Sequence, residues 1–144
     1  MTIARATVIT DASFCPRTRA GGWAAWININ WPNGTHERIK KSGLFHESPD
    51  NSTAAERWAC YNGIWFAYNR GARSILAQTD CLSVVRRPFL NNNPAALHWP
   101  EAQVSWRHVK GHTAGNTRRE WVNNWCDSEA KKHMRKQRSQ CLTT

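Results

Sequence analysis

The stretch from residue 22 to residue 31 most constrains the fold, because hydrophobic residues occupy every second position along it. One face of an extended strand would then carry Trp23, Ala25, Ile27, Ile29 and Trp31. The segment Pro32-Asn33-Gly34 follows and is typical of a turn between antiparallel strands. We therefore predict a hairpin between residues 22–31 and a second strand near Arg38 to Phe45.

A further strand precedes this hairpin. The residues from Thr7 to Thr10 are a β-branched run, and Pro16 and Gly21-Gly22 mark a loop after it. The prediction ends this strand at Asp11 and joins the three strands in an antiparallel meander.

Helices and strands alternate after the meander. The segment from Ser48 to Thr53 carries helix-start signals, and Gly71 would end that helix. The remaining predicted elements are a strand over Ser74–Thr79, a helix over Leu82–Leu90, a strand over Val104–Val109 and a helix from about Arg119 to Lys136. This order predicts one α/β domain over residues 1–137 and a flexible tail over residues 138–144.

The net charge of the chain indicates which class of partner it binds. Its 144 residues include 20 Lys and Arg against 10 Asp and Glu, which gives a formal net charge of +10. A polyanion is the expected partner, because each phosphate paired with Lys or Arg releases condensed counterions. Nucleic acid is the default candidate, and charge alone does not separate DNA from RNA.

The hydrophobic runs, the N-terminus and the cysteines indicate where in the cell the protein is expected. No hydrophobic run approaches the roughly 20 residues needed to cross a bilayer, and the N-terminal residues lack the pattern of a signal peptide. The five cysteines are an odd number without C-x-x-C spacing, and none pairs with a histidine at zinc-ligand spacing, so we interpret them as thiols. We expect a soluble, cytoplasmic monomer with no membrane partner.

Acidic residues are scarce, yet four of them stand at the ends of hydrophobic segments or on predicted helices. They are Asp11, Glu56, Asp80 and Asp127. Carboxylate oxygens are the ligands that hard divalent cations prefer, so the set indicates a metal site. Taken singly, Asp11 could cap a turn and Glu56 could favour a helix start.

The motifs around these acids occur in a characteristic order. They are Thr10-Asp11-Ala12-Ser13, Gly21-Gly22-Trp23-Ala24, Ala55-Glu56, Thr79-Asp80, Val109-Lys110-Gly111-His112, and Asn123 with Asp127. In this order they resemble type 1 ribonuclease H along nearly the whole chain. The resemblance implies a ribonuclease H-like α/β fold, in which a five-stranded mixed sheet of three antiparallel meander strands and two further strands is flanked by helices.

The resemblance also implies a reaction and its residues. The implied activity is hydrolysis of the RNA strand of an RNA/DNA hybrid with two Mg²⁺ ions, for which Mn²⁺ could substitute. Asp11 would bridge both ions. Asp80 and Asp127 would bind the ion that activates water, and Glu56 the ion that faces the leaving group. His112 would assist proton transfer or product release.

Substrate contacts and departures from the family pattern complete this hypothesis. The expected substrate-binding residues are Ser13, Ser52, Thr53, Lys110 and Asn123. The interval between Asp80 and His112 is too short for the extra basic helix and loop of many bacterial members. Thr53 and Leu82 stand where many members have polar amides that contact the hybrid minor groove.

Two alternatives to hybrid cleavage stay open. The first is a nuclease of the same fold that acts on DNA junctions or single strands, since a fold does not settle a substrate. The second is a non-catalytic, basic nucleic-acid-binding module in which the acids are structural caps. For the nine tryptophans we predict burial in most cases, including Trp23 on a strand and Trp58 and Trp65 on one helix face.

Overall fold

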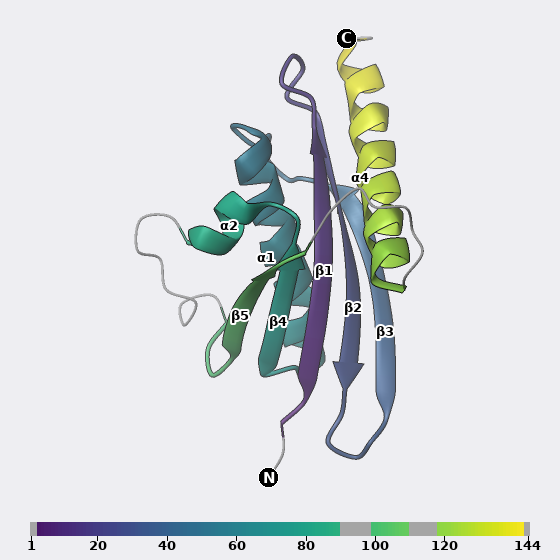
Figure 1. Cartoon of the computed structure of the whole chain (residues 1–144). Coiled ribbons are helices and arrows are strands. Elements are labelled where there is room, and N and C mark those ends of the chain that lie inside the picture. Colours follow the sequence, from purple (N-terminus) through teal and green to yellow (C-terminus); the bar gives the residue numbers. More distant parts are fainter. Residues whose placement is uncertain (1–2, 90–98, 110–117, 143–144) are drawn as a thin grey trace.

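A computed structural model describes residues 3–89, 99–109 and 118–142, with the backbone alone for residues 118–120 and 141–142. A five-stranded sheet forms the centre of the molecule, in the order β3-β2-β1-β4-β5 (Figure 1). The strands are β1 (Arg5–Phe14), β2 (Gly21–Asn30), β3 (His36–Leu44), β4 (Ser74–Thr79) and β5 (Gln103–His108). β1, β2 and β3 pair in antiparallel fashion, while β4 runs parallel to both β1 and β5. The mixed sheet and the meander predicted from the sequence are confirmed.

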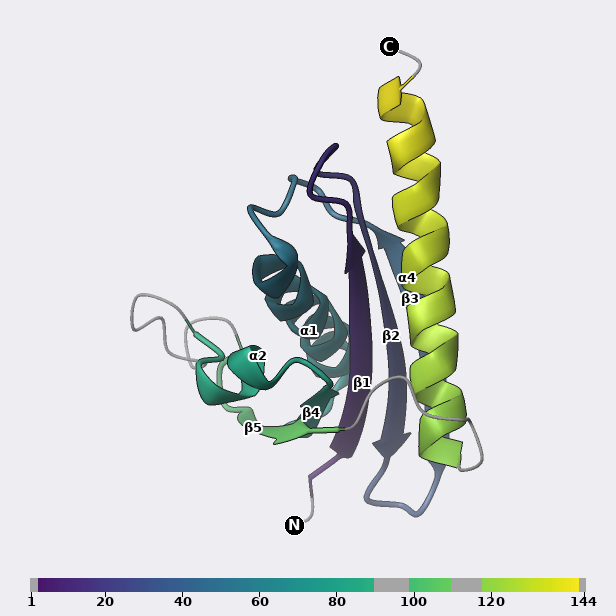
Figure 2. The ribbon, with the colours of Figure 1, turned by 45° about the horizontal axis from the view of Figure 1, so that its top comes forward.

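Helices cover both faces of this sheet. α1 (Ser52–Arg70) and the short α2 (Leu82–Arg86) lie on one face, and α4 (Arg118–Leu142) lies on the other (Figure 2). α4 packs against β1, β2 and β3, and α1 packs against β1, β2 and β4. β1 is therefore sandwiched between the two long helices, which is where the candidate site is built.

The alternation along β2 divides the core into two clusters. Trp23, Ala25, Ile27 and Ile29 are buried in the cluster beneath α1. Ala24 and Trp26 point the other way and are buried with Val122 and Cys126 of α4. The alternation that predicted a strand is confirmed, and it reflects a strand that is buried on both faces.

Several predicted boundaries are wrong. β1 continues to Phe14 because β2 pairs with it as far as Gly21, so Asp11 lies inside the strand rather than at its end. α2 ends at Arg86 instead of Leu90, since the proline at position 88 forces an extended backbone on Arg87.

The last helix is longer than predicted. α4 continues past Lys136 to Leu142, and residues 138–142 are helical. Met134 is buried, and the Gln137 side chain accepts a hydrogen bond from the backbone N–H of Gly21 at 2.8 Å. The Gln137 contact with the β1–β2 hairpin lies beyond Lys136, where the helix was predicted to end.

The tryptophans are mostly buried or half-buried, as predicted, with two exceptions. Trp65 and Trp121 are each 53% exposed, so the expected burial of Trp65 is wrong. The four described cysteines are free thiols. Across the described residues, no helix is both long and hydrophobic enough to cross a bilayer.

Candidate metal centre

Asp11 and Asp80 lie where two parallel strands separate. The parallel pairing of β1 with β4 extends to Ile9 opposite Gln78. Asp11 comes two residues after Ile9, and Asp80 directly follows the last residue of β4. Because the carboxyl ends of parallel strands meet at the same edge of a sheet, both side chains reach the same region.

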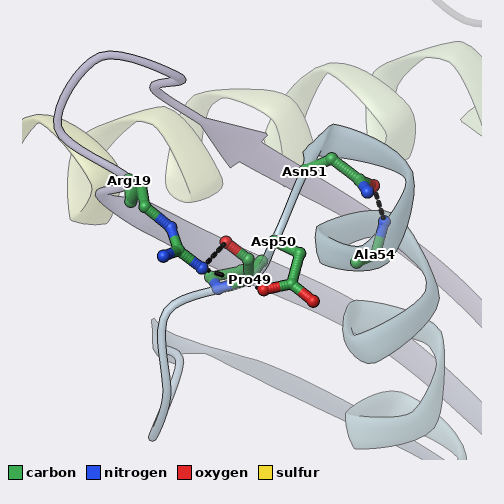
Figure 3. Close-up of polar contacts among 5 residues, drawn as sticks. All are labelled: Arg19, Pro49, Asp50, Asn51 and Ala54. Atoms are coloured by element: carbon green, nitrogen blue, oxygen red, sulfur yellow. Dashed lines mark hydrogen bonds and ion pairs between the residues drawn. The ribbon is translucent and has the colours of Figure 1, made fainter.

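Glu56 approaches this region from the start of α1. The side chain of Asn51 caps the helix, because its Oδ1 accepts a hydrogen bond from the N–H of Ala54 at 2.8 Å. Arg19, in the β1–β2 hairpin, donates to Asp50 Oδ1 at 2.9 Å and to the Pro49 carbonyl at 3.3 Å (Figure 3). The hairpin that follows Asp11 thus holds the segment that begins the Glu56 helix.

A close contact between α1 and β1 sets how near Glu56 can come. Gly63 lies seven residues after Glu56, which places both on one helix face. A Cβ atom on Gly63 would lie 2.5 Å from Val8 Cγ1 and 2.8 Å from Thr10 Cγ2. Only a glycine lets the helix lie this close to the strand. One turn nearer the site, the Thr10 hydroxyl and the Cys60 thiol are 3.1 Å apart.

These constraints bring three carboxylates together. One oxygen each from Asp11, Glu56 and Asp80 lies within 4.8 Å of the other two. Asp11 is 8% exposed, and Oε2 of Glu56 is buried without a hydrogen-bond partner among the described residues. Buried polar atoms are normally paired, so the unpartnered oxygen and the all-oxygen donor set fit a divalent cation. The triad is compatible with metal binding.

The protonation of the triad reflects this crowding. Burial, followed by the charge of Asp80, raises the pKa of Asp11 to about 8, although hydrogen bonds with Glu56 and the Ala12 N–H oppose the shift. Burial, followed by the charges of Asp11 and Asp80, also raises the pKa of Glu56 well above its usual value. Without a cation the site therefore retains protons near neutral pH, and a bound cation would displace them.

Asp127 lies on the opposite side of β1, on α4. Its Oδ2 forms an ion pair with Lys131 Nζ at 2.9 Å, and Asp127 is not a member of the triad. Its charge nevertheless contributes to the raised pKa of Asp11. Gly22 lets α4 approach the sheet, because a Cβ atom there would lie 2.3 Å from the Ala130 carbonyl oxygen.

The other predicted site residues fall into three groups. Ser13 is half-buried on β1, two residues after Asp11 and on the same strand face. Ser52 and Thr53 open α1, with Ser52 exposed and Thr53 half-buried, and Asn123 is half-buried one turn before Asp127. Lys110 and His112 lie outside the described residues.

Some residues that shape the site were not predicted. Gly63 could have been found, because a glycine inside a helix seven residues after a candidate ligand indicates a close approach. His108, whose Nε2 donates to the Asp80 carbonyl oxygen at 3.2 Å, is the last residue of β5 and has no motif of its own. Arg19 has a backbone φ of +59°, and nothing in the sequence around it indicates its hydrogen bonds to Pro49 and Asp50.

Comparisons with known proteins identify the family and the fold. Residues 10–99 match the model of the reverse transcriptase-like family, a range that includes the three clustered acids and ends before Asp127. Comparison with the curated proteins gives no sequence match.

Solved structures show the same fold. The N-terminal ribonuclease H domain of a Mycobacterium tuberculosis protein, solved as a fusion with maltose-binding protein, aligns with a TM-score of 0.65 at 12% identity and covers 96% of this chain and 99% of that chain. Ribonuclease H1 of the halophilic archaeon Halobacterium salinarum gives 0.59 at 14% identity, over 92% and 98% of the two chains. LC11-RNase H1, solved in complex with an RNA/DNA hybrid, gives 0.52 at 12% identity, over 91% and 97%.

The family match covers more than half of the chain, and the structural matches extend over nearly all of it. The resemblance inferred from the motifs is therefore confirmed at the level of family and fold. The chain belongs to the reverse transcriptase-like family and has the fold of type 1 ribonuclease H.

Proposed function

We propose that the protein is a metal-dependent endonuclease that hydrolyses the RNA strand of RNA/DNA hybrids. The observation that carries this proposal is the triad of buried Asp11 with half-buried Glu56 and Asp80, in which one oxygen of each residue lies within 4.8 Å of the others. Three carboxylates this close repel one another when all are ionised, and such a cluster is typical of a functional site. The fold, which is shared with ribonucleases H, makes phosphodiester hydrolysis the reaction class that best fits this triad.

Asp11, Glu56 and Asp80 would hold the cations, with Asp127 completing the ligand set from α4. Two Mg²⁺ ions, or Mn²⁺ in their place, would supply an activated hydroxide and neutralise the charge that develops on the phosphate. Asp11 is central to the ligand set because it lies on the strand between the two helices. For Asp127 to take part, its carboxylate must exchange the Lys131 ammonium for a cation.

The remaining predicted residues would serve the substrate. The hydroxyls of Ser13, Ser52 and Thr53, the Lys110 ammonium and the Asn123 amide are groups that bind phosphate and sugar oxygens. His112 would move a proton to or from the reacting oxygens. A hybrid exposes 2′-hydroxyls in a wide minor groove, so recognition would depend on shape and backbone more than on base sequence.

Two observations support a hybrid as the substrate. The chain has a net charge of +10, which suits a polyanionic duplex. LC11-RNase H1, which has the same fold, was solved with an RNA/DNA hybrid. We further propose that residues 1–137 form one catalytic domain and that the protein acts as a cytoplasmic monomer.

Cleavage assays on matched substrates test this proposal. Hybrid, duplex DNA, duplex RNA and single strands of one sequence, each strand with its own label, are incubated with Mg²⁺ or Mn²⁺ and with chelator. We expect internal cuts in the RNA strand of the hybrid, which chelator abolishes. Asp11→Asn should remove the activity, whereas Glu37→Gln, which breaks the distant ion pair with Arg70, should retain it.

Other outcomes would replace the proposal with a defined alternative. Chelator-resistant cleavage, or equal activity of the wild type and Asp11→Asn, would contradict a metal mechanism. Cleavage of DNA alone would indicate a nuclease of the same fold with another substrate. Tight hybrid binding without cleavage under either metal would indicate a non-catalytic binding module.

A further inference from the structure

The two sides of α1 differ in their chemistry. The side that faces the sheet carries small residues at four-residue spacing, namely Ala59, Gly63 and Ala67, which are fully buried. The outer side carries Trp58, Tyr61, Asn62 and Trp65, whose spacing of three and four places them on one face. A solvent-facing helix surface is normally polar, so this aromatic face calls for an explanation.

Two adjoining cavities lie over this outer face. The larger, with a volume of about 380 Å³, is lined by Trp23, His46, Tyr61, Asn62, Trp65, Phe66 and Trp99. The smaller, of about 240 Å³, shares His46, Tyr61 and Asn62 with it. We refer to the two together as the α1 cavity. Its size is in the range of small-ligand sites, which is roughly 300–1,000 Å³.

The aromatic walls are held in place mainly by contacts with one another. Trp23 stacks on Phe66 with ring centroids 6.0 Å apart, and its indole N–H donates to the Leu44 carbonyl oxygen at 3.1 Å. Trp65 meets Phe66 edge to face at 5.0 Å, and Tyr61 meets Trp99 at 5.7 Å. The walls are thus pre-organised, which lowers the entropy cost of binding a flat ligand.

Polar groups at the cavity could fix the orientation of a ligand. His46 is exposed and Asn62 is half-buried, and neither side chain has a hydrogen-bond partner among the described residues. The Asn62 amide offers both donors and an acceptor, the combination that the edge of a nucleobase requires. At the margin, the Lys41 ammonium lies 5.3 Å from the centre of the Phe66 ring.

We propose that the α1 cavity binds an unpaired nucleobase of single-stranded nucleic acid. Every base has a π-face that stacks on tryptophan, and the amide and imidazole would contact the base edge. The net charge of +10 and the nearby Lys41 favour a ligand that carries phosphates over an uncharged aromatic compound. The outer face of α1 is distinct from the face that carries Gly63, so this binding does not depend on metal or on cleavage.

Fluorescence anisotropy without metal tests the proposal on the full chain. A labelled DNA strand of about eight thymidines, long enough for one site, is titrated with protein in chelator, beside a strand of the same length whose bases are missing. We expect the abasic strand to bind more weakly. Trp65→Ala should weaken binding of the thymidine strand by about fivefold or more, because base stacking on one ring is lost, and Trp65→Phe should restore most of it.

The matched control is Trp121→Ala, since Trp121 is also 53% exposed but packs on Trp26 beneath α4. Circular dichroism of each variant confirms that it is folded. We expect Trp121→Ala to bind the thymidine strand as the wild type does. The proposal is overturned if neither strand binds, if the abasic strand binds as tightly as the thymidine strand, or if Trp65→Ala and Trp121→Ala weaken binding equally.

Discussion

The two sides of β1 present carboxylates in opposite electrostatic states. Glu56 of α1 joins Asp11 and Asp80 in a cluster of three carboxylates, and its Oε2 is buried with no partner among the described residues. On the α4 side, Asp127 is neutralised by Lys131 at 2.9 Å and remains partly exposed. The difference is that the triad brings three acids together and is compatible with a divalent cation, whereas Asp127 already has a cationic partner in Lys131.

Both long helices approach the sheet closely at a glycine. The difference in charge between their acids therefore does not come from a difference in packing. Gly63 lets α1 lie close to β1, and Gly22 lets α4 lie close to β2. Each helix then places an acid near Asp11. The contrast therefore arises from the neighbouring charges rather than from a looser fit of one helix.

The largest expected effect is the loss of activity on removal of the shared carboxylate. Asp11→Asn should lower the rate of hybrid cleavage about a thousandfold or more, because Asp11 lies between both sides and no neighbouring acid can replace it. Asp127→Asn should cost less, since Asp127 lies outside the triad. Single-turnover rates with Mg²⁺ measure both, and equal losses for the two variants would remove the proposed asymmetry.

The second effect concerns stability in the absence of metal. The pKa of Asp11 is about 8 in the folded protein against an ordinary value of 3.8, so the folded state holds more protons than the unfolded chain between these pH values. Stability contributed by this group therefore falls as pH rises through that window. Asp11→Asn should raise the free energy of unfolding at pH 8 on the order of a few kcal/mol, and by less at pH 5.

Urea unfolding in chelator at the two pH values measures this stability difference. The wild type with added Mn²⁺ is the control, because a bound cation should recover stability that the variant gains without metal. A difference between wild type and Asp11→Asn that stays constant from pH 5 to pH 8 would contradict a proton shared within the triad.

The third effect tests the close approach of the helices. Gly63→Ala should destabilise the fold by roughly 1–3 kcal/mol, because the added methyl overlaps Val8 and Thr10. It should also weaken Mn²⁺ binding, since Glu56 moves with α1. Gly43→Ala is the matched control, because its Cβ would make ordinary contacts at 3.5 Å with Trp23, and it should change stability by about 0.5 kcal/mol or less.

Gly22→Ala separates the two sides. It should destabilise the protein through the Ala130 carbonyl but leave Mn²⁺ affinity closer to that of the wild type than Gly63→Ala does. Urea unfolding and calorimetric titration give both quantities. A larger loss of metal affinity in Gly22→Ala than in Gly63→Ala would place the main cation site on the α4 side.

The smallest effect is expected at Lys131. Lys131→Met removes an exposed ion pair between residues four positions apart, worth about 0.3–0.5 kcal/mol of stability. If Asp127 joins the ligand set, the substitution should also lower the Mg²⁺ concentration that gives half-maximal cleavage, because one competitor for its carboxylate is gone. An increase in that concentration would show that Lys131 itself assists the reaction.

The sequence predicted the sheet because β2 carries its pattern locally. Alternation of Trp23, Ala25 and Ile27, followed by a Pro-Asn-Gly turn, depends on few tertiary contacts. The predicted end of β1 was wrong because the true end depends on a tertiary contact. The residues after Asp11 carry local loop signals, but β1 continues because it pairs with β2 as far as Phe14 opposite Gly21.

The same distinction holds for the candidate site. The positions of Glu56 near a helix start and of Asp80 at a strand end could be inferred from the sequence, but the distances among the three acids depend on packing between elements far apart in the chain. Lys131 lies four residues after its partner Asp127 on one helix, a local spacing, although we did not predict the pair. The bond from Arg19 to Asp50, in contrast, joins two loops that no sequence pattern connects. Elements with a local sequence pattern can therefore be predicted, whereas contacts between distant parts of the chain cannot.

The most direct test of the central claim is the number of protons released when Mn²⁺ binds at pH 7. Isothermal titration calorimetry in two buffers with different ionisation enthalpies measures this number for the wild type, Asp80→Asn and Glu37→Gln. We predict that the wild type and Glu37→Gln release about one proton for each bound ion, because the cation displaces a proton from the triad, and that Asp80→Asn binds far more weakly. Equal Mn²⁺ affinity in all three proteins, or binding without proton release, would contradict the account.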